Sequence, residues 1–528
     1  MTLIKSVLLG SAAGIVAVAS AQAADLPTHK AAPVAQYVKI CDVGGITGWV
    51  MPGSDTCMKI SGFITSQFTG GNLSEQYNWA GSVITPLAQA ENPFAPANSS
   101  QVILVQGGDR AVPIYNAFTG KSLGLTLPNQ KNATFNRDAI GWSMRTNLGM
   151  DFASNTAYGP LIGHFDFNAE MANGYQPLAT SIYVNTAYLT WAGITTGKAQ
   201  SFYSFTGGGD NWNNIFSPDR KGFNEPLLFA YTASFGGGFS ATISAESQGS
   251  VGNSGGGTNM TGAAGSNPGA ITFGGQRWPD IVGALHVKQG WGEAQLSGVL
   301  HNVNVKDYTY YDATGCGYYS AGALSGCDAS ETKVGWGIDA GVKFNLPWYP
   351  GDNFLITGTY TQNAVWYSGL PDGMWGENGQ VGGNGQPMYL ADAYFNPLTN
   401  SWSTPRAWSV AAILEHHWTP TIYTDLEGSV GGINWSNMNG HTCYGGFYSC
   451  TGTGVLSPHS LSWIVGTDIG WNPVTNLNFD LELMYQSTHQ DQPSGFLGTV
   501  YSTGAYVPGA WQGTSNGFSG RFRVTRYF

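Results

Sequence analysis

Residues 142–152 have the sequence WSMRTNLGMDF, in which two kinds of side chain alternate at every position. One set is apolar apart from a threonine and consists of Trp142, Met144, Thr146, Leu148, Met150 and Phe152. The other set is polar, charged or small and consists of Ser143, Arg145, Asn147, Gly149 and Asp151. Successive residues of a β-strand point to opposite faces, whereas a helix would spread these charges around its surface. The stretch therefore predicts a strand with one apolar and one polar face.

The same two-residue period returns along the chain, for example in residues 161–171 (LIGHFDFNAEM) and 477–486 (LNFDLELMYQ). Sixteen such segments begin near Lys59, Trp142, Leu161, Ile182, Ile194, Leu227, Phe239, Ile281, Trp291, Lys333, Phe354, Pro405, Thr421, Leu461, Leu477 and Phe518. The fourth and twelfth segments do not reveal which face is outward. Counts of fourteen and eighteen strands therefore stay open beside sixteen.

The connections between these segments alternate in length. Strands two and three, four and five, and so on to fourteen and fifteen are joined by tight turns such as Ala192-Gly193, Gly236–Gly238 and Asn472-Pro473. The other connections are longer and rich in Gly, Asn, Ser and Pro. Short turns on one rim and long loops on the other are typical of outer-membrane barrels, and an even strand number places both chain ends on the short-turn, periplasmic rim.

The composition favours the same fold class. Charged residues make up 10% of the chain, against about 25% in a typical soluble domain. After the leader, no segment approaches an uninterrupted apolar run long enough for a membrane-spanning helix. Backbone groups in hydrocarbon must pair within the protein, so a sheet spans a bilayer only if it closes. We predict an all-β, transmembrane antiparallel barrel of sixteen strands over residues 58–528.

Aromatic residues gather at the predicted strand ends, as expected for the belts that barrels place at the two membrane interfaces. They are Trp142, Tyr158, Trp191, Trp291, Trp348, Tyr349, Trp418 and Trp471. The last segment, 518–528 (FSGRFRVTRYF), ends on Phe528. A C-terminal aromatic strand resembles the signal by which outer-membrane barrels are recognised for assembly. The alternative is an ordinary edge strand that ends in Phe by chance.

Residues 1–23 are predicted to be a secretion signal. Lys5 precedes an apolar stretch, Val7 to Ala19, and Ala21-Gln22-Ala23 fits the pattern at which signal peptidase cuts. The apolar stretch is shorter than the roughly 20 residues that cross a bilayer. Loss of Lys5 would change the formal net charge from −11 to −12. An acidic chain with no basic run argues against nucleic-acid binding.

Export to an oxidising compartment makes the six cysteines candidates for disulfides. They form three pairs that are local in sequence, Cys41 with Cys57, Cys316 with Cys327, and Cys443 with Cys450. None of these spacings fits a four-ligand zinc site. Sequence alone does not fix the connectivity, but each pair lies in a Gly-, Ser- or Tyr-rich stretch, which favours disulfides that staple loops. Free buried thiols are the alternative. The first pair belongs to residues 24–57, a predicted periplasmic segment.

Several short segments resemble the alphaproteobacterial porin family. They are LLGSAAG at 8–14, AQAADLP at 21–27, YVKIC at 37–41, PGSDTCMKI at 52–60, GKAQSF at 197–202 and FSATIS at 239–244. With the strand pattern, the resemblance covers nearly the whole mature chain, and the N-terminal cysteine segment is its most specific part. It implies a trimeric, sixteen-stranded diffusion porin of the bacterial outer membrane, with the third external loop folded into the lumen. The chain departs from the family in its long loops, especially 70–136 and 368–403.

The resemblance and the barrel pattern together predict a water-filled channel for passive diffusion of small hydrophilic solutes and ions. Such a protein needs no catalytic residues, cofactor or metal; its expected partners are outer-membrane lipid, the permeating solutes and two further copies of itself. Selectivity would depend on the charges and the diameter at the narrowest point. The net charge favours a weak preference for cations.

The charges expected at this constriction come from several strands and from the third external loop, residues 203–226. The candidates are Lys59, Arg145, Lys198, Arg521 and Arg523, with Asp210, Asp219 and Glu225 on the loop. Lumen acids on later strands are Asp425, Glu427, Asp468, Asp480 and Glu482. We hypothesise a basic wall of Arg145, Arg521 and Arg523 facing an acidic lip formed by the loop. The alternatives are a loop that lies outside and arginines that pair locally.

Three other functions stay open. A channel specific for sugars or organic ions would use the Trp- and Tyr-rich loops as a stacking surface. A plugged barrel would be structural or adhesive. A barrel enzyme would need a nucleophile beside His301, His441, His459 or His489, and nothing in the sequence places one there.

Overall fold

The computed structural model describes residues 39–71, 140–174, 181–206, 225–247, 277–305, 331–370, 392, 401–435, 459–491 and 514–528. It also describes short strands within 88–126, 311–316, 394–396 and 499–507. The predicted secretion signal, residues 1–23, lies outside this part of the chain. Among the described residues, no helix is long and apolar enough to cross a membrane.

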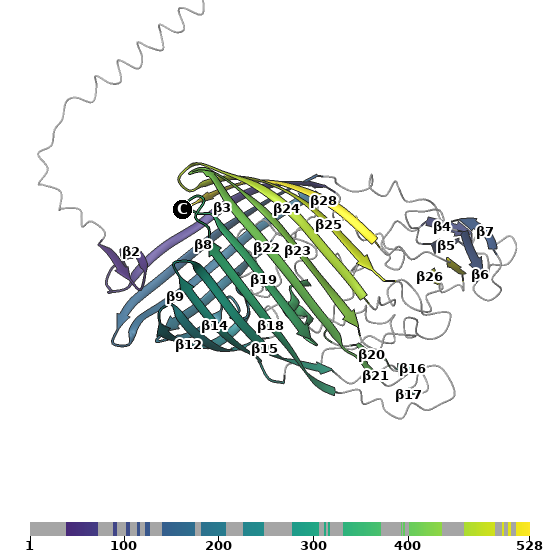
Figure 1. Ribbon diagram of the computed structural model, residues 1–528, viewed down its shortest axis with the longest axis horizontal. Helices are drawn as coiled ribbons and strands as arrows, with labels where there is room; N and C mark the ends of the chain where they lie inside the picture. The colour runs from purple at the N-terminus through teal and green to yellow at the C-terminus, as the bar shows by residue number, and fades with distance from the viewer. Residues whose placement is uncertain are drawn as a thin grey trace, which may run out of the picture.

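Sixteen strands form one closed antiparallel barrel (Figure 1). They are β3 (Cys57–Gly71), β8 (Ile140–Thr156), β9 (Gly159–Gly174), β10 (Ser181–Trp191), β11 (Ile194–Lys198), β12 (Leu227–Gly236), β13 (Phe239–Glu246), β14 (Asp280–Gln289), β15 (Gly292–Val305), β18 (Glu331–Asn345), β19 (Asn353–Gln362), β22 (Pro405–Thr419), β23 (Ile422–Trp435), β24 (His459–Val474), β25 (Leu477–Gln490) and β28 (Thr514–Tyr527). Each pairs with its neighbours in chain order. The predicted fold class and strand number are confirmed.

The barrel closes where its last strand meets its first. β28 pairs antiparallel with β3 from Ser519↔Gly71 to Tyr527↔Phe63. Beyond this register, Phe528 and Gly62 exchange two backbone hydrogen bonds of 3.0 and 3.1 Å. The predicted terminal aromatic strand therefore supplies the seam, so that neither strand keeps an open edge at this point.

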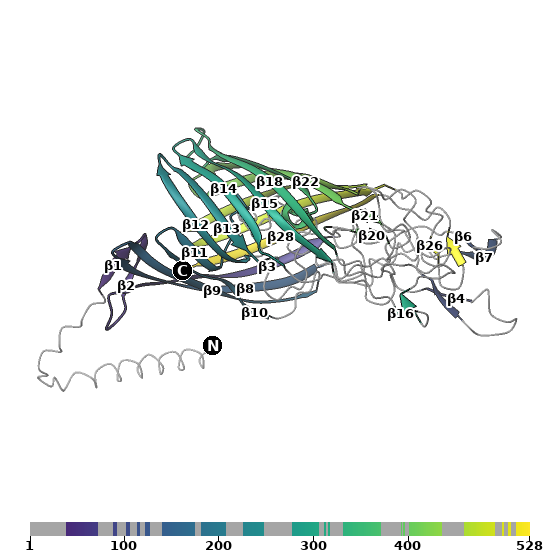
Figure 2. The ribbon, with the colours of Figure 1, turned by 90° about the horizontal axis from the view of Figure 1, so that it is seen from below.

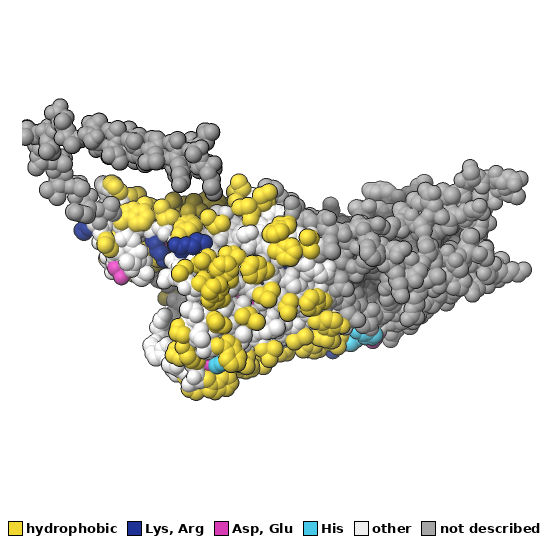
Figure 3. Space-filling view, turned by 90° about the horizontal axis from the view of Figure 1, so that it is seen from above, with side chains coloured by type: hydrophobic (Ala, Val, Ile, Leu, Met, Phe, Trp, Pro, Cys, Tyr) yellow, Lys and Arg dark blue, Asp and Glu magenta, His cyan; other side chains and the backbone are white. Residues whose placement is uncertain are grey.

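The outer wall is apolar because every second residue of a strand points away from the lumen. Large hydrophobic side chains there are exposed, among them Leu148, Phe229, Ile243, Leu285 and Leu426. Figure 3 shows hydrophobic side chains spread over the described outer wall. At the short-turn rim the aromatic residues are Tyr158, Trp191, Trp291, Trp348, Trp418 and Trp471. Trp142 lies near the long-loop end of β8, so aromatic residues mark both edges of the apolar band.

A hairpin precedes the barrel at the short-turn end (Figure 2). β1 (Ile40–Val43) pairs with β2 (Ile46–Val50), and β2 pairs with the start of β3. A disulfide between Cys41 and Cys57 fixes the hairpin to β3, which confirms the first predicted pair. The side chains of Cys316, Cys327, Cys443 and Cys450 lie outside the described residues, so those pairings stay predictions.

The long connections carry short extra strands. β4 (Ala88–Glu91), β5 (Val102–Val105), β6 (Pro113–Asn116) and β7 (Ser122–Thr126) lie between β3 and β8. β16 (Tyr311–Asp312), β17 (Gly315–Cys316), β20 (Tyr394–Asn396), β21 (Ser401–Ser403), β26 (Thr499–Val500) and β27 (Ala505–Val507) lie in later connections. β27 pairs with β6, which joins the eighth connection to the first. One 3-10 turn, η4 (Val365–Ser368), lies in the sixth connection.

Candidate functional site

The third connection, residues 199–226 and here called loop 3, enters the lumen. Tyr203 is fully buried, and its hydroxyl lies 2.5 Å from the Thr359 hydroxyl on β19. Ser297 on β15 donates a hydrogen bond of 2.6 Å to the Tyr203 carbonyl. Loop 3 therefore reaches strands well beyond β12, to which it leads. The described part of the predicted inward loop does lie inside the barrel.

A glycine makes room for this loop against the wall. A Cβ added to Gly341 on β18 would lie 2.2 Å from Cδ1 and 2.6 Å from Cγ of Phe205. The Phe205 ring thus occupies the space that any other residue at position 341 would fill. Two loop residues proposed for the acidic lip, Asp210 and Asp219, lie outside the described residues.

Glu225, the third lip residue, lies at the end of loop 3 beside a lysine. Its Oε2 is 2.9 Å from Nζ of Lys198 on β11, and Lys198 also donates to the Asn185 carbonyl. Burial raises the pKa of the Glu225 carboxyl to about 7, although the nearby Lys198 ammonium opposes that rise. Glu225 therefore changes its charge near neutral pH.

Arg145 on β8 also has a carboxylate partner. Its Nε lies 2.7 Å from Oε2 of Glu170 on the neighbouring strand β9. The Arg145, Glu170, Lys198 and Glu225 side chains remain between 14% and 17% exposed. His164 on β9 is 20% exposed and bonds Asp151 on β8 at 2.6 Å. This exposure shows that water reaches the lumen wall along β8, β9 and β11.

The two arginines of β28 are buried beside the seam. Arg521 forms a salt bridge with Glu482 on β25, and both residues are at most 2% exposed. Arg523 donates two hydrogen bonds, of 2.9 and 3.1 Å, to Oε1 of Gln67 on β3. The Glu482 carboxylate neutralises the Arg521 guanidinium, and Gln67 accepts hydrogen bonds from the Arg523 guanidinium.

Lys59 differs from the other basic candidates. It is exposed, and its register partner on β8 is Asp151, five residues before the end of that strand at the short-turn rim. The candidate Lys59 therefore lies toward the periplasmic mouth, away from the loop 3 contacts.

These placements change the arrangement expected from the sequence. A basic wall was expected to face an acidic lip across the lumen. In the described residues, Arg145 and Arg521 each bond a carboxylate on the neighbouring strand, and Lys198 bonds Glu225 at the end of loop 3. The reason is the strand register, which sets Glu170 directly opposite Arg145 and Glu482 directly opposite Arg521. The charges pair locally.

The acids on β23, β24 and β25 form a row across neighbouring strands. Asp425 is the register partner of Asp468, and Asp468 is the register partner of Glu482, whose other neighbour is Arg521. Like charges directly opposite each other destabilise a sheet. Glu427, on the same face of β23, is 2% exposed, and neither of its carboxylate oxygens has a hydrogen-bond partner among the described residues.

The start of a second loop also lies in the lumen, and no pattern in the sequence predicted it. The sixth connection, residues 363–404 and here called loop 6, begins with Asn363 and η4. Tyr367 packs edge-on against Tyr203 with ring centroids 4.9 Å apart. Loops 3 and 6 thus meet inside the barrel and share one small core with Val282 and Val299. The start of loop 6 is at most 1% exposed at Ala364, Val365, Tyr367, Ser368 and Leu370.

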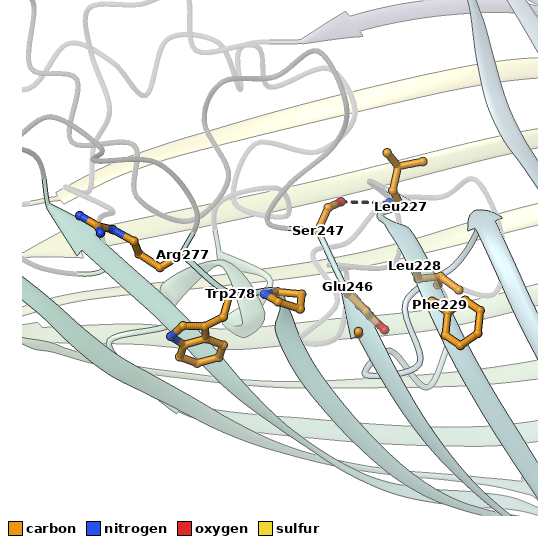
Figure 4. A pocket seen from close by; sticks show the side chains of 9 residues that line it. Leu227, Leu228, Phe229, Glu246, Ser247, Arg277 and Trp278 are labelled. Atoms are coloured by element: carbon orange, nitrogen blue, oxygen red, sulfur yellow. Dashed lines mark hydrogen bonds between the residues drawn. The ribbon is translucent and has the colours of Figure 1, made fainter.

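An open groove of about 460 Å³ lies at the long-loop end of β12 and β13. Figure 4 shows Arg277 and Trp278 on one side of it and Leu227, Phe229 and Ser247 on the other. Ser247 accepts a 3.0 Å hydrogen bond from the Leu227 backbone N–H, which joins the ends of the two strands. Among the described residues, no group of three or more His, Cys, Asp or Glu side chains converges as metal ligands do.

Comparison with known proteins places this architecture in a family. The family model described as the porin subfamily matches residues 25–91 and 122–514. Porin Omp2a of Brucella ovis is 27% identical over 360 residues, which is 65% of this chain and 86% of that protein. Porin Omp2b of Brucella neotomae is 26% identical over 358 residues, or 65% and 80% of the two chains.

One solved structure has a comparable fold. The outer membrane channel DcaP of Acinetobacter baumannii superposes with a TM-score of 0.50 and 13% identity, covering 91% of this chain and 99% of that one. At this identity the likeness concerns the fold alone. The family and the names of the relatives indicate a channel rather than an enzyme. Because the family model matches most of a closed sixteen-stranded barrel with a polar lumen, this chain belongs to the porin subfamily and forms a channel in the bacterial outer membrane.

Proposed function

We propose that this channel is a general diffusion pore with a weak preference for cations. The observation that carries the proposal is the partly exposed charged wall on β8, β9 and β11, which loop 3 reaches with Glu225. Both signs of charge occur there, in the Arg145–Glu170 and Lys198–Glu225 pairs. Small hydrophilic solutes of either charge would therefore pass, and the size of the solute relative to the pore would be the main restriction.

The cation preference follows from the balance of charges in the chain. Asp425, Glu427, Asp468, Asp480 and Glu482 outnumber the two arginines of the adjoining strand β28, but at most 5% of each acid is exposed, so these groups act only weakly on permeating ions. Along the wetter wall, Arg145 and Lys198 are each matched by a carboxylate. The preference for cations therefore rests on the formal net charge of −11, which favours cations over anions only weakly.

Arg145, Lys198 and Glu225 are the residues that we propose for the constriction, together with Asp210 and Asp219 on the same loop. Arg521 and Arg523 would act less directly, because their guanidinium groups are satisfied within the wall. Lys59 would influence ions at the periplasmic mouth. Phe528 would carry the assembly signal, since it both ends the chain and closes the seam.

We also propose a homotrimer without enzymatic activity. The trimer is what the resemblance to alphaproteobacterial porins implies. His301, the buried histidine considered for catalysis, has both ring nitrogens bonded to carboxylates and therefore cannot serve a nucleophile. The remaining partners of the channel would be the permeating solutes and ions and the lipid around its apolar wall.

The test is planar-bilayer recording of the purified protein with salt gradients and sugars of graded size. Large ohmic current steps that sugars do not block, with a reversal potential on the cation side, are the expected result. Small steps that one class of sugar or organic ion blocks would replace the proposal by a specific channel. An absence of steps from correctly folded protein would replace it by a plugged barrel.

A further inference from the structure

Loop 6 turns inward immediately after β19. Asn363 has a positive φ of 54°, and η4 ends at Gly369 with a φ of 71°. These left-handed residues reverse the chain on both sides of the 3-10 turn. Leu370 then packs against the wall, where a Cβ on Gly431 of β23 would lie 2.7 Å from its Cδ2. The start of loop 6 is therefore held against the inner wall and does not continue outward.

Tyr367 provides the first polar tie between this turn and the wall. Its hydroxyl donates a 2.5 Å hydrogen bond to Oδ2 of Asp280 at the start of β14. Its carbonyl accepts from Thr359 on β19 at 3.3 Å. The ring packs between Tyr203 of loop 3 and His301 of β15. One residue thus connects loop 6 to loop 3 and to three strands.

Asp392 provides the second tie, from a later part of loop 6. Its Oδ1 accepts a 2.5 Å hydrogen bond from the Val365 backbone N–H, and its Oδ2 lies 3.1 Å from Nε2 of His301. Nδ1 of His301 lies 3.0 Å from both oxygens of Asp280. The imidazole therefore bridges a wall carboxylate and a loop carboxylate, and all three side chains are at most 2% exposed.

A third tie lies on the other side of the turn. Ser409 on β22 donates a 2.5 Å hydrogen bond to the Ser368 carbonyl. The lumen face of β22 is apolar here, with Ala407, Ala411 and Ile413 buried. A charged loop would find no partner on this face, whereas the apolar and backbone groups of the turn fit it. The wall and the loop are complementary.

We infer that the start of loop 6, residues 363–370, is a second constriction element, and that His301, Tyr367 and Asp392 are the positioning residues that hold it in the lumen. This inference rests on the proposed function as an open diffusion channel. A barrel of sixteen strands leaves a lumen wider than its side chains can fill. The described parts of loops 3 and 6 contact the wall from β13 to β23, whereas the charged side chains of β8, β9 and β11 stay partly exposed to water.

The test uses a double variant that keeps the shape of the ties but removes the Tyr367 hydroxyl and the Asp392 charge, Tyr367→Phe with Asp392→Asn. The first substitution preserves the ring contacts, and the second removes the charge that attracts His301. We expect a unitary conductance roughly 1.5- to 2-fold above that of the native channel, because lumen cross-section limits ion flow. The largest permeating sugar should increase in size as well. The control is Tyr231→Phe with Asp42→Asn, which removes the same groups from the outer wall and the hairpin.

A second measurement does not depend on conduction. Ser368→Cys places a thiol on the buried turn. A water-soluble maleimide should label it slowly in the native background and several-fold faster in the double variant. Should the double variant fail to fold, Tyr367→Phe alone takes its place, since it keeps the ring packing.

The outcomes separate this inference from the proposed function. A native channel that conducts, with equal conductance and equal labelling in the double variant, would overturn the role of loop 6 and leave the general pore intact. A native protein that never conducts would overturn the general pore, and the labelling experiment would still decide whether these residues hold loop 6.

Discussion

Glu225 and Lys198 form the charge pair at the exit of loop 3, and the state of this pair depends on pH. The Glu225 carboxyl has a pKa of about 7, chiefly because it is buried. Above that pH the pair carries one charge of each sign, and below it only the Lys198 charge persists. Single residues in the lumen can therefore set the ion preference of the whole channel.

The first prediction concerns this titration. Acidification protonates Glu225 and removes a negative charge, so the preference for potassium over chloride should fall between about pH 8 and about pH 6, which lie on either side of that pKa. In Glu225→Gln the low preference should be present at both pH values. Reversal potentials in a salt gradient measure it. Asp55→Asn, in the exposed turn between β2 and β3, is the control and should behave like the native protein.

A second prediction concerns Arg145. Arg145→Ala leaves the Glu170 carboxylate without its 2.7 Å partner on a wall that water reaches. The cation preference should rise, and the reversal potential should move in the direction opposite to that of Glu225→Gln. Arg526→Ala removes an exposed arginine near the short-turn rim and should have little effect. Unchanged selectivity in Arg145→Ala would remove this residue from the constriction.

At the scale of elements, two strands explain why the sequence left the strand count open. In β10, Ile182 and Val184 are exposed before a register shift, and Leu189 and Trp191 are exposed after it. The irregularity between Val184 and Ala187 exchanges the two faces, so no single period fits the segment. A local bulge of this kind depends on the partner strand β9, which a pattern along one segment does not contain.

β22 is the second ambiguous strand, for a different reason. Its lumen face carries Ala407, Ala411 and Ile413, so both faces of the segment are apolar. The alternation is weak there because loop 6 packs on that face. Loop 6 itself could not be predicted, since its ties join loop side chains to Asp280 and His301 across long stretches of chain. The charged site residues were found from the alternation, but their partners depend on strand register.

Loop 3 yields an element-scale prediction. In Gly341→Ala the added Cβ would lie 2.2 Å from the Phe205 ring, so the start of loop 3 must move away from β18. We expect a higher and more variable unitary conductance, because the start of loop 3 no longer has a single fixed position in the lumen. Gly283→Ala on β14 is the matched control, since its Cβ would meet nothing within 4 Å. Native conductance in Gly341→Ala would show that this contact does not define the pore.

The N-terminal hairpin of β1 and β2 yields a second prediction at the scale of elements. The Cys41–Cys57 disulfide closes a loop with a sequence separation of 16, for which chain entropy suggests about 3 kcal/mol of local stabilisation. Cys41→Ser with Cys57→Ser should allow a protease to cut within residues 40–56 while the barrel stays intact. Mass spectrometry of the fragments identifies the cut. Equal resistance of the variant and native hairpins would mean that the pairing of β1, β2 and β3 suffices.

At the scale of the whole molecule, polar and apolar residues alternate along every strand of a closed sheet. This alternation gives the barrel a polar inner surface and an apolar outer surface. That is why the fold class was predictable while the loops were not: hydrocarbon constrains every strand in the same way. The long connections meet no such constraint, and their positions depend on particular contacts inside the barrel.

Closure of the wall gives the last prediction. Phe528→Ala should lower the fraction of protein that assembles in outer membranes, and Phe528→Tyr should retain it, if an aromatic C-terminus is the assembly signal. Heat-modifiable migration on a gel reports the folded fraction. Assembly of Phe528→Ala at the native level would reduce the role of Phe528 to its backbone bonds with Gly62.

The seam also has a consequence in time. Thr65 and Thr525 share a 3.0 Å hydrogen bond, although 460 positions separate them in the chain. The ribosome and the export machinery deliver the earlier strand long before the later one. During that interval the incomplete sheet has an apolar outer face and an unpaired edge strand, both of which promote aggregation. This polypeptide should therefore depend on periplasmic chaperones until its final strand arrives, and contacts of such long range should make its folding slow.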